Sequence, residues 1–143
     1  MIIPIASDHA GFEAKKIVKR ILEERDITTI DFGTNSTDSV DYPEFASYVA
    51  QAVNNGDHDL GILICASGQG MCMTANKYPK VRAALAWNKD MARISREHNN
   101  ANILCLPGKF LKEDELKAVV CEWLDSEFMG GRHKRRIDKI EIK

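Results

Sequence analysis

Short apolar segments alternate with amphipathic helical segments along the chain, and this alternation restricts its possible folds more than any other feature. The apolar segments cover residues 2–6, 27–32, 60–65, 81–86 and 101–106. Each is followed by a polar loop and then by apolar residues at spacings of three and four, as on one face of a helix. Five strand–helix units in this order predict a parallel sheet with right-handed crossovers.

The third apolar segment, Leu60 to Cys65, indicates how the sheet is covered. It is almost uninterrupted in its apolar character, as expected when helices lie on both faces of a parallel sheet. The chain has 143 residues, the usual size of one domain, and shows no internal repeat or linker. We therefore predict a single α/β domain over 1–143, doubly wound in three layers like Rossmann and flavodoxin folds, with a five-stranded parallel sheet. The last part of this domain, residues 128–143, is a basic segment.

Charge, hydropathy and cysteine usage exclude several classes of partner. Lys and Arg total 20 against 21 Asp and Glu, so the chain lacks the basic excess typical of nucleic-acid binding. No apolar run approaches the ~20 residues that cross a bilayer, and the first residues do not resemble a signal peptide. Four cysteines without a CxxC pair and four scattered histidines predict no metal site. We expect a cytoplasmic protein without a membrane or nucleic-acid partner.

The loop after the third apolar segment is the strongest candidate for chemistry, because ligands of such sheets bind at the carboxyl ends of the strands. Its sequence is Cys65-Ala66-Ser67-Gly68-Gln69-Gly70. The glycines let backbone N–H groups approach a ligand, and the following helix presents its positive end to an anion or a thiolate. Cys65 is therefore a candidate base or nucleophile. A buried, purely structural cysteine is the alternative.

Two more specific interpretations of this loop fail. A cysteine phosphatase needs an arginine six positions after the cysteine, and that position holds Met71. A dinucleotide-binding GxGxxG motif needs a third glycine, where the chain has Met73. A flavin site is compatible with the fold, but the fold alone does not determine function.

Further polar candidates lie in other loops. Asp8 and His9 follow the first apolar segment, where they could bind hydroxyls or a phosphate, or Asp8 could cap a helix. His98 ends the apolar face of the fourth helix. Arg132 and Arg136 are four residues apart, so on a helix both guanidinium groups would share one face and could hold a phosphate.

Taken together, six short motifs resemble the type B ribose-5-phosphate isomerases over nearly the whole chain. They are Ser7-Asp8-His9-Ala10-Gly11-Phe12, Asp41-Tyr42-Pro43, Gly61-Ile62-Leu63-Ile64-Cys65 with its Ser-Gly-x-Gly loop, Ala75-Asn76-Lys77, Ser95-Arg96-Glu97-His98-Asn99 and Gly130-Gly131-Arg132-His133. The isomerases of galactose 6-phosphate and allose 6-phosphate share part of this pattern.

The resemblance implies interconversion of ribose 5-phosphate and ribulose 5-phosphate through an enediolate, without a metal or organic cofactor. It also implies a homodimer whose sites are shared between subunits. In that family pattern Cys65 is the base, and His98 opens the sugar ring. The implied substrate-binding residues are the loop amides of Ala66, Ser67, Gly68, Gln69 and Gly70, the sugar-binding Asp8, His9 and Asn99, the phosphate-binding Arg132 and Arg136, together with Lys109 and the pocket-lining Tyr42.

The chain departs from the family pattern at positions that bear on sugar preference. The departures are Ala66 for Gly, Ser67 for Thr, Gln69 for a small aliphatic residue, Lys109 for Arg, and Trp87 for a smaller residue. One alternative function is isomerisation of a six-carbon sugar phosphate, although Cys65 favours the pentose because galactose 6-phosphate isomerase subunits lack it. The other is a non-catalytic sugar-phosphate-binding module, which would need neither Cys65 nor His98.

Overall fold

The computed structural model describes residues 1–142, and in them the strands form one five-stranded parallel sheet of order β2-β1-β3-β5-β4. Lys143, the last residue of the expected basic segment, lies outside the described residues. The strands are β1 (Ile2–Ser7), β2 (Thr28–Asp31), β3 (Gly61–Cys65), β4 (Ala83–Leu85) and β5 (Ile103–Pro107). The helices are α1 (Phe12–Glu24), α2 (Tyr42–Asn54), α3 (Gln69–Ala75), α4 (Lys89–Glu97), α5 (Glu113–Asp125) and α6 (Arg132–Asp138). The predicted parallel α/β sheet is confirmed.

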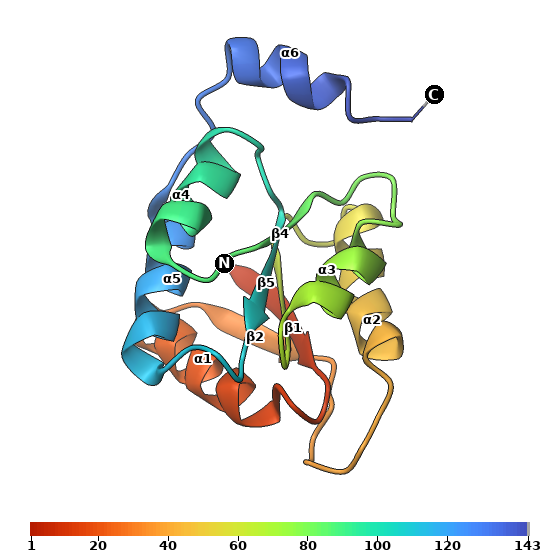
Figure 1. Ribbon diagram of the computed structural model, residues 1–143, viewed down its shortest axis with the longest axis vertical. Coiled ribbons are helices and arrows are strands. Elements are labelled where there is room, and N and C mark those ends of the chain that lie inside the picture. The colour runs from red at the N-terminus through yellow and green to blue at the C-terminus, as the bar shows by residue number, and fades with distance from the viewer. Residues whose placement is uncertain (143) are drawn as a thin grey trace.

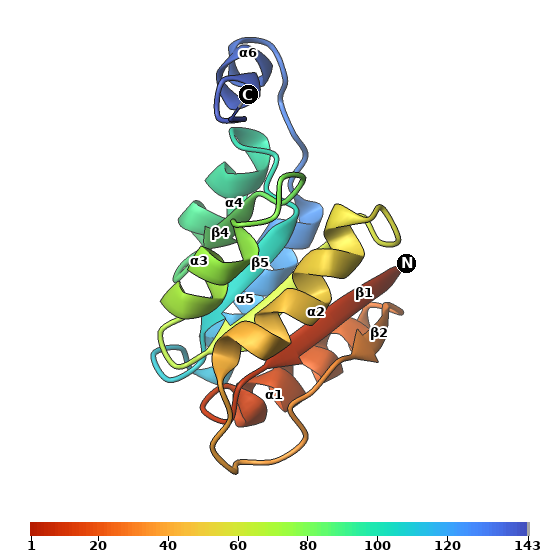
Figure 2. The ribbon, with the colours of Figure 1, turned by 90° about the vertical axis from the view of Figure 1, so that its right-hand side faces the viewer.

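Helices cover both faces of the sheet, as the apolar third strand predicts. One core joins the sheet to α1, α4 and α5, and the other joins it to α2 and α3 (Figures 1 and 2). The direction of each crossover explains this division, because right-handed connections place their helix on a face set by the direction of travel. The chain moves one way across the sheet from β2 to β3 and β4. It returns from β4 to β5, which brings α4 to the face of α1.

Side chains from successive residues of β3 enter opposite cores. Ile62 and Ile64 pack with α1 and α5, whereas Leu63 and Cys65 pack with α2 and α3. This alternation follows from the period of two in a strand. It places Cys65 at the end of the central strand, directly beneath the start of α3.

The strand bounds differ from the predicted ranges by one or two residues at one or both ends. β4 covers Ala83–Leu85 rather than 81–86, because it is the edge strand and pairs only with β5. The basic cluster forms α6, which confirms that Arg132 and Arg136 lie on one helix. Figures 1 and 2 show α6 beyond the rest of the molecule, at the end where α4 finishes. No helix within residues 1–142 has both the length and the apolar character needed to cross a membrane.

Candidate active site

Backbone hydrogen bonds join the loops that follow the central strands. The N–H of Asp8 donates to Ile64 O at 3.3 Å, so the loop after β1 lies against the end of β3. On the other side, the N–H of Gly108 donates to Cys65 O at 2.8 Å, and that of Lys109 donates to Ala66 O at 3.1 Å. The sheet therefore brings Asp8, Cys65 and Lys109 to one edge, as the parallel topology predicts.

Two glycines allow these loops to approach so closely. A methyl group at Gly11 would lie 2.5 Å from Ile64 O, so only glycine lets the first turn of α1 pack on β3. A methyl group at Gly70 would lie 2.4 Å from Cε1 of Tyr42, which shows that the tyrosine ring rests on the start of α3. Tyr42 thus borders the Cys65 loop, although its own position is the first residue of α2.

The Cys65 loop folds back so that one of its own backbone N–H groups contacts the Cys65 sulfur. Cys65 is buried, and its Sγ accepts a hydrogen bond from the N–H of Gly68 at 3.1 Å. Gly68 has a φ of 77°, a left-handed conformation that turns the chain into α3. Among residues 1–142, no acceptor bonds to the N–H groups of Ser67 and Gly70. Backbone N–H groups that lack a hydrogen-bond acceptor can stabilise an oxygen anion that forms close to them.

Asp8 and His9 have their side chains fixed next to this loop. Asp8 is buried, and its Oδ1 accepts the N–H of Gly11 at 3.0 Å. This bond stabilises the turn before α1. The sequence suggests that Asp8 caps a helix, and Asp8 does bond a backbone N–H group here, but that group belongs to Gly11, the residue just before α1. His9 Nδ1 accepts the N–H of Val40 at 3.1 Å, which joins the loop before α2 to the turn before α1. Gln69 is exposed and points its side chain away from the core.

The other candidate residues lie at the opposite end of the molecule. His98 is the residue at which α4 ends, and its ring stacks on that of His133 at a centroid distance of 4.2 Å. The N–H of Met129 donates to Glu97 O at 3.0 Å, which also holds the start of the C-terminal segment to α4. Arg132 and Arg136 of α6 and Asn99 are exposed at this end.

His133 contributes to the site in a way that sequence analysis missed. Burial lowers the pKa of His133, and the neighbouring His98, Arg132 and Arg136 lower it further. Its Nε2 is buried without a hydrogen-bond partner among the described residues. A neutral imidazole fits this position between two arginines better than a charged one. The motif Gly130-Gly131-Arg132-His133 contains the residue, but nothing in the sequence indicates its stacking partner.

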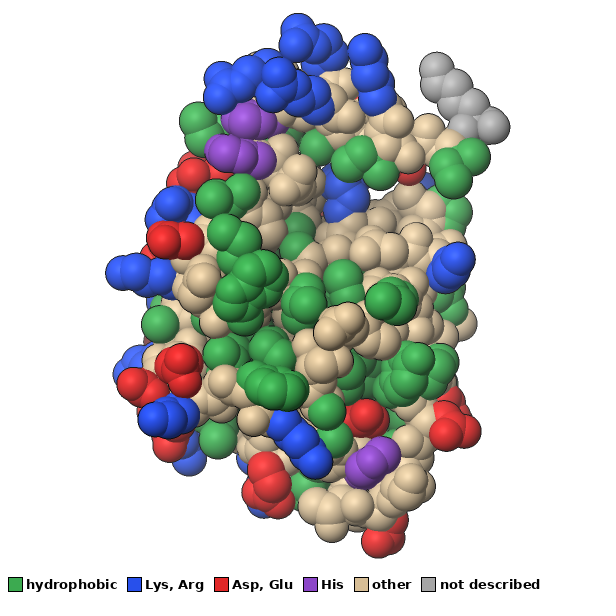
Figure 3. All heavy atoms as spheres, viewed as in Figure 1, with side chains coloured by type: hydrophobic (Ala, Val, Ile, Leu, Met, Phe, Trp, Pro, Cys, Tyr) green, Lys and Arg blue, Asp and Glu red, His purple; other side chains and the backbone are tan. Residues whose placement is uncertain are grey.

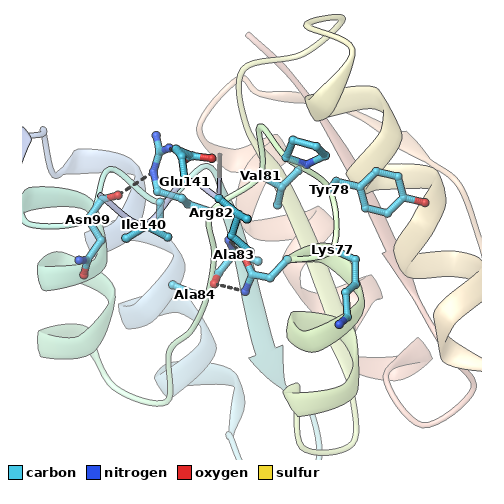
Figure 4. Close-up of a pocket in the computed structure, with 13 residues that line it drawn as sticks. Lys77, Tyr78, Val81, Arg82, Ala83, Ala84, Asn99, Ile140 and Glu141 are labelled. Carbon is cyan, nitrogen blue, oxygen red and sulfur yellow. Dashed lines mark hydrogen bonds and ion pairs between the residues drawn. The ribbon is translucent and has the colours of Figure 1, made fainter. Parts of the chain in front are cut away.

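A cleft of about 510 Å³ lies at the His98 end rather than beside Cys65. It separates the start of β4 from residues 140–142, and Figure 4 shows Arg82, Asn99 and Glu141 along its wall. The Nε of Arg82 donates to Asn99 O at 2.9 Å, and its guanidinium group pairs with Glu141 at 3.6 Å. Arg82 therefore links the end of α4 to the chain that follows α6.

The candidate residues thus form two groups at opposite ends of one chain. The first group surrounds Cys65 and comprises Asp8, His9, Tyr42, Ala66, Ser67, Gly68, Gln69, Gly70 and Lys109. The second surrounds His98 and comprises Asn99, Arg132 and Arg136. Figures 1 and 2 place α6 at one end of the molecule and the loop that follows β1 at the other. Within residues 1–142, no three His, Cys, Asp or Glu side chains are grouped closely enough to hold a metal ion.

Comparison with known proteins identifies the family. The family described as Ribose/Galactose Isomerase matches residues 3–140. The chain belongs to this family. Among its relatives, a probable ribose-5-phosphate isomerase B from Mycoplasma genitalium is 48% identical over 138 residues, covering 95% of this chain and 91% of the relative.

Solved structures of the ribose/galactose isomerase family share this fold throughout. Ribose-5-phosphate isomerase B from Clostridium thermocellum superposes with a TM-score of 0.96 at 48% identity, covering 98% of this chain and 95% of that one. The Mycoplasma genitalium enzyme, solved with bound ribulose-5-phosphate, superposes with a TM-score of 0.92 at 48% identity, covering 97% and 93%. The resemblance stated from the motifs is therefore confirmed at the level of the family.

Proposed function

We propose that the protein interconverts ribose 5-phosphate and ribulose 5-phosphate. The observation that carries this proposal is the 48% identity, over nearly the full length, to an isomerase solved with bound ribulose-5-phosphate. The chain also carries a cysteine whose sulfur accepts the N–H of Gly68, in a loop at the edge where ligands of such sheets bind. A sugar phosphate is then the ligand, and the reaction is a proton transfer within it.

In this proposal Cys65 is the base that moves the proton. In the open-chain aldehyde, a thiolate at Cys65 removes the C2 proton, and the electron pair of that bond forms an enediolate with its charge on O1. Returning the proton to C1, with a proton passing from O2 to O1, gives the ketose. A positioned base contributes about 10²–10⁴-fold to such a step. The free N–H groups of Ser67 and Gly70 would stabilise the enediolate oxygen.

The second group of residues would open the sugar ring and bind the phosphate. Ribose 5-phosphate is mostly a closed furanose, so an acid or base must open the ring, and the imidazole of His98 can both donate and accept a proton. Arg132 and Arg136 would bind the phosphate through charged hydrogen bonds, and Asn99 would contact the sugar. In the first group, Asp8, His9, Tyr42 and Lys109 would bind the rest of the sugar.

The two groups can act on one substrate only if they come from different subunits, and we propose a homodimer with shared sites. Exposed apolar side chains border the edge strand β4, where Figure 3 shows a hydrophobic area flanked by Lys and Arg over α6. Met73, Trp87 and Phe110 are among them, each more than half exposed. An exposed apolar area of this kind is typical of an interface.

All parts of the chain would then contribute to one active site or its partner. We propose that residues 1–143 form one isomerase domain, whose segment from 128 onward carries the phosphate-binding arginines to the partner's Cys65 loop.

Turnover assays with purified protein test the function. Ribose 5-phosphate should be converted to ribulose 5-phosphate, whereas allose 6-phosphate and galactose 6-phosphate should be converted more slowly at equal concentration. Faster conversion of a six-carbon substrate would reassign the activity within the family. Binding of ribose 5-phosphate by calorimetry without any turnover would instead indicate a sugar-phosphate-binding module.

A further inference from the structure

The loop between β2 and α2 is fixed to the body of the protein by a buried lysine. Lys15 of α1 is only 1% exposed, and its Nζ pairs with Asp31 at 2.7 Å and donates to Thr34 O at 2.5 Å. Asp31 also accepts the N–H of Gly33 at 2.8 Å. Burial lowers the pKa of Lys15, and the Asp31 carboxylate opposes that shift. A buried charge with these partners holds the start of the loop in one position.

The same loop is joined to the end of β1, directly before Asp8 and His9. The N–H of Ser7 donates to Gly33 O, and the N–H of Thr34 donates to Ser7 O, both at 2.8 Å. The far end of the loop returns to this place, where the N–H of Val40 donates to His9 Nδ1 at 3.1 Å. The loop is therefore held at both ends around the His9 ring.

The contact with Val40 determines which nitrogen of His9 carries the proton. A neutral imidazole has one protonated nitrogen and one that accepts a hydrogen bond. Since Nδ1 accepts the backbone N–H, the proton must lie on Nε2. We infer that Val40, through its backbone N–H, is a positioning residue that holds His9 in the Nε2–H tautomer and makes it a hydrogen-bond donor to the substrate.

This assignment complements the neighbouring Asp8. A carboxylate only accepts hydrogen bonds when it is ionised, so Asp8 suits a sugar hydroxyl that donates. His9 in the Nε2–H form suits an oxygen that accepts, in a hydroxyl or a phosphate. Adjacent residues with opposite hydrogen-bonding character would fix the orientation of a sugar phosphate. The identity of this ligand rests on the proposed function, whereas the tautomer itself does not.

Nitrogen-15 NMR of the histidine side chains tests the tautomer directly. With His9 assigned by comparison with a His9→Gln variant, the native protein above neutral pH should show a protonated Nε2 and an unprotonated Nδ1 for this ring. Val40→Pro removes the N–H and should give a mixture of tautomers, whereas the control Val40→Ala keeps the N–H and the native pattern. An Nδ1–H pattern in the native protein would overturn the inference, and this spectrum decides alone if Val40→Pro does not fold.

Kinetics add a second readout. Loss of one correctly placed donor should raise KM for ribulose 5-phosphate about five- to tenfold in folded Val40→Pro, with a smaller change in kcat and a native KM in Val40→Ala. An unchanged KM together with an unchanged spectrum in Val40→Pro would contradict the positioning role. Absence of turnover in the native protein would count against the proposed function and leave the spectroscopic test intact.

Discussion

Cys65 and His98 are chemically suited to different steps, and the structure places them at different ends of the chain. Cys65 is buried and accepts the backbone N–H of Gly68, which suits a base whose product is an anion. His98 lies at a helix end against a second imidazole, which suits the exchange of a proton with a ring oxygen. Separate roles imply that the two variants fail in different ways.

Solvent exchange distinguishes those roles. In deuterium oxide, Cys65→Ala should abolish exchange of the C1 proton of ribulose 5-phosphate, because no base remains to form the enediolate. His98→Asn should retain that exchange while net formation of ribose 5-phosphate slows, because ring closure is impaired. Proton NMR of ribulose 5-phosphate follows both processes in one sample. Native exchange in folded Cys65→Ala would remove Cys65 from the role of base.

The Lys15–Asp31 pair gives the protein a pH-dependent stability. Burial tends to raise the pKa of Asp31, but hydrogen bonds from Lys15, Gly33 and Lys19 outweigh it and leave the pKa below 3.8. A lowered carboxyl pKa stabilises the folded state above the unfolded pKa, and this stabilisation is lost as the pH falls through the folded pKa. The contribution of Asp31 should therefore be complete near pH 5 and decline below 3.8.

Asp31→Asn tests this contribution. At pH 7 it should reduce the free energy of unfolding by about 1–3 kcal/mol, because Lys15 stays buried with a weaker partner. The reduction should shrink as the pH falls below 3.8, where the native carboxylate also becomes protonated. Urea denaturation at several pH values measures both. Asp57→Asn, in an exposed turn, is the control, and an equal effect of Asp31→Asn at every pH would contradict the prediction.

At the residue scale, motifs in the sequence indicate which side chains to expect but not their partners. Asp8 follows one apolar segment and Cys65 ends another, so the pattern predicts their place at the sheet edge. The contact of Tyr42 with Gly70, and of Val40 with His9, depends on how separate loops fold against each other. Such contacts involve backbone groups, which every residue carries. Residue type therefore does not indicate which residues make them.

Among the elements, α6 depends on few contacts with the rest of the chain. His133 and Ile137 are its buried residues, so its position follows from the stack on His98 and from one apolar side chain. The two glycines before it, Gly130 and Gly131, both have positive φ values and turn the chain into the helix. A short helix held in this way presents Arg132 and Arg136 outward.

Free phosphate measures the role of those arginines. Arg132→Ala and Arg136→Ala should each weaken competitive inhibition by inorganic phosphate, by about 1.5–3 kcal/mol for a charged hydrogen bond. Lys134→Ala removes the same charge from the same helix but lies two residues from each arginine, on the other side of the helix, so it should change inhibition little. Unchanged inhibition in the double variant of Arg132 and Arg136 would refute the phosphate-binding role.

Element type was predictable along most of the chain, whereas the order of the last two strands was not. Apolar runs and helical spacing depend on local sequence, and they indicate every strand and its approximate bounds. Placement of β5 inside β4 depends on which strands pack best against β3, a property of the whole sheet. The same position at the edge shortens β4, because the edge strand has a neighbouring strand on one side only.

In the proposed function, one end of the molecule carries out proton transfer, and the other opens the ring and binds the phosphate. Its broad apolar area near β4 lies between them in the view of Figure 3. A two-fold dimer brings the same surface of each subunit together, so the Cys65 end of one chain can face the His98 end of the other. Each dimer would then contain two equivalent sites.

Mixing two inactive variants tests this arrangement. Cys65→Ala and His98→Ala chains, each inactive alone, are mixed in equal amounts and allowed to exchange subunits. If the two residues of a site come from different chains, every mixed dimer has one intact site and one doubly altered site. Random pairing then restores about a quarter of native activity, because half of the dimers are mixed and each has one of two sites.

The control makes this result decisive. Each variant mixed with itself under the same conditions should stay inactive, and mass spectrometry of differently labelled chains shows whether subunits have exchanged. If Cys65 and His98 of one chain served the same site, every site in the mixed dimer would lack one of them. Complete exchange without recovered activity would therefore reject shared sites, and recovery near a quarter would place Cys65 and His98 of each working site on opposite subunits.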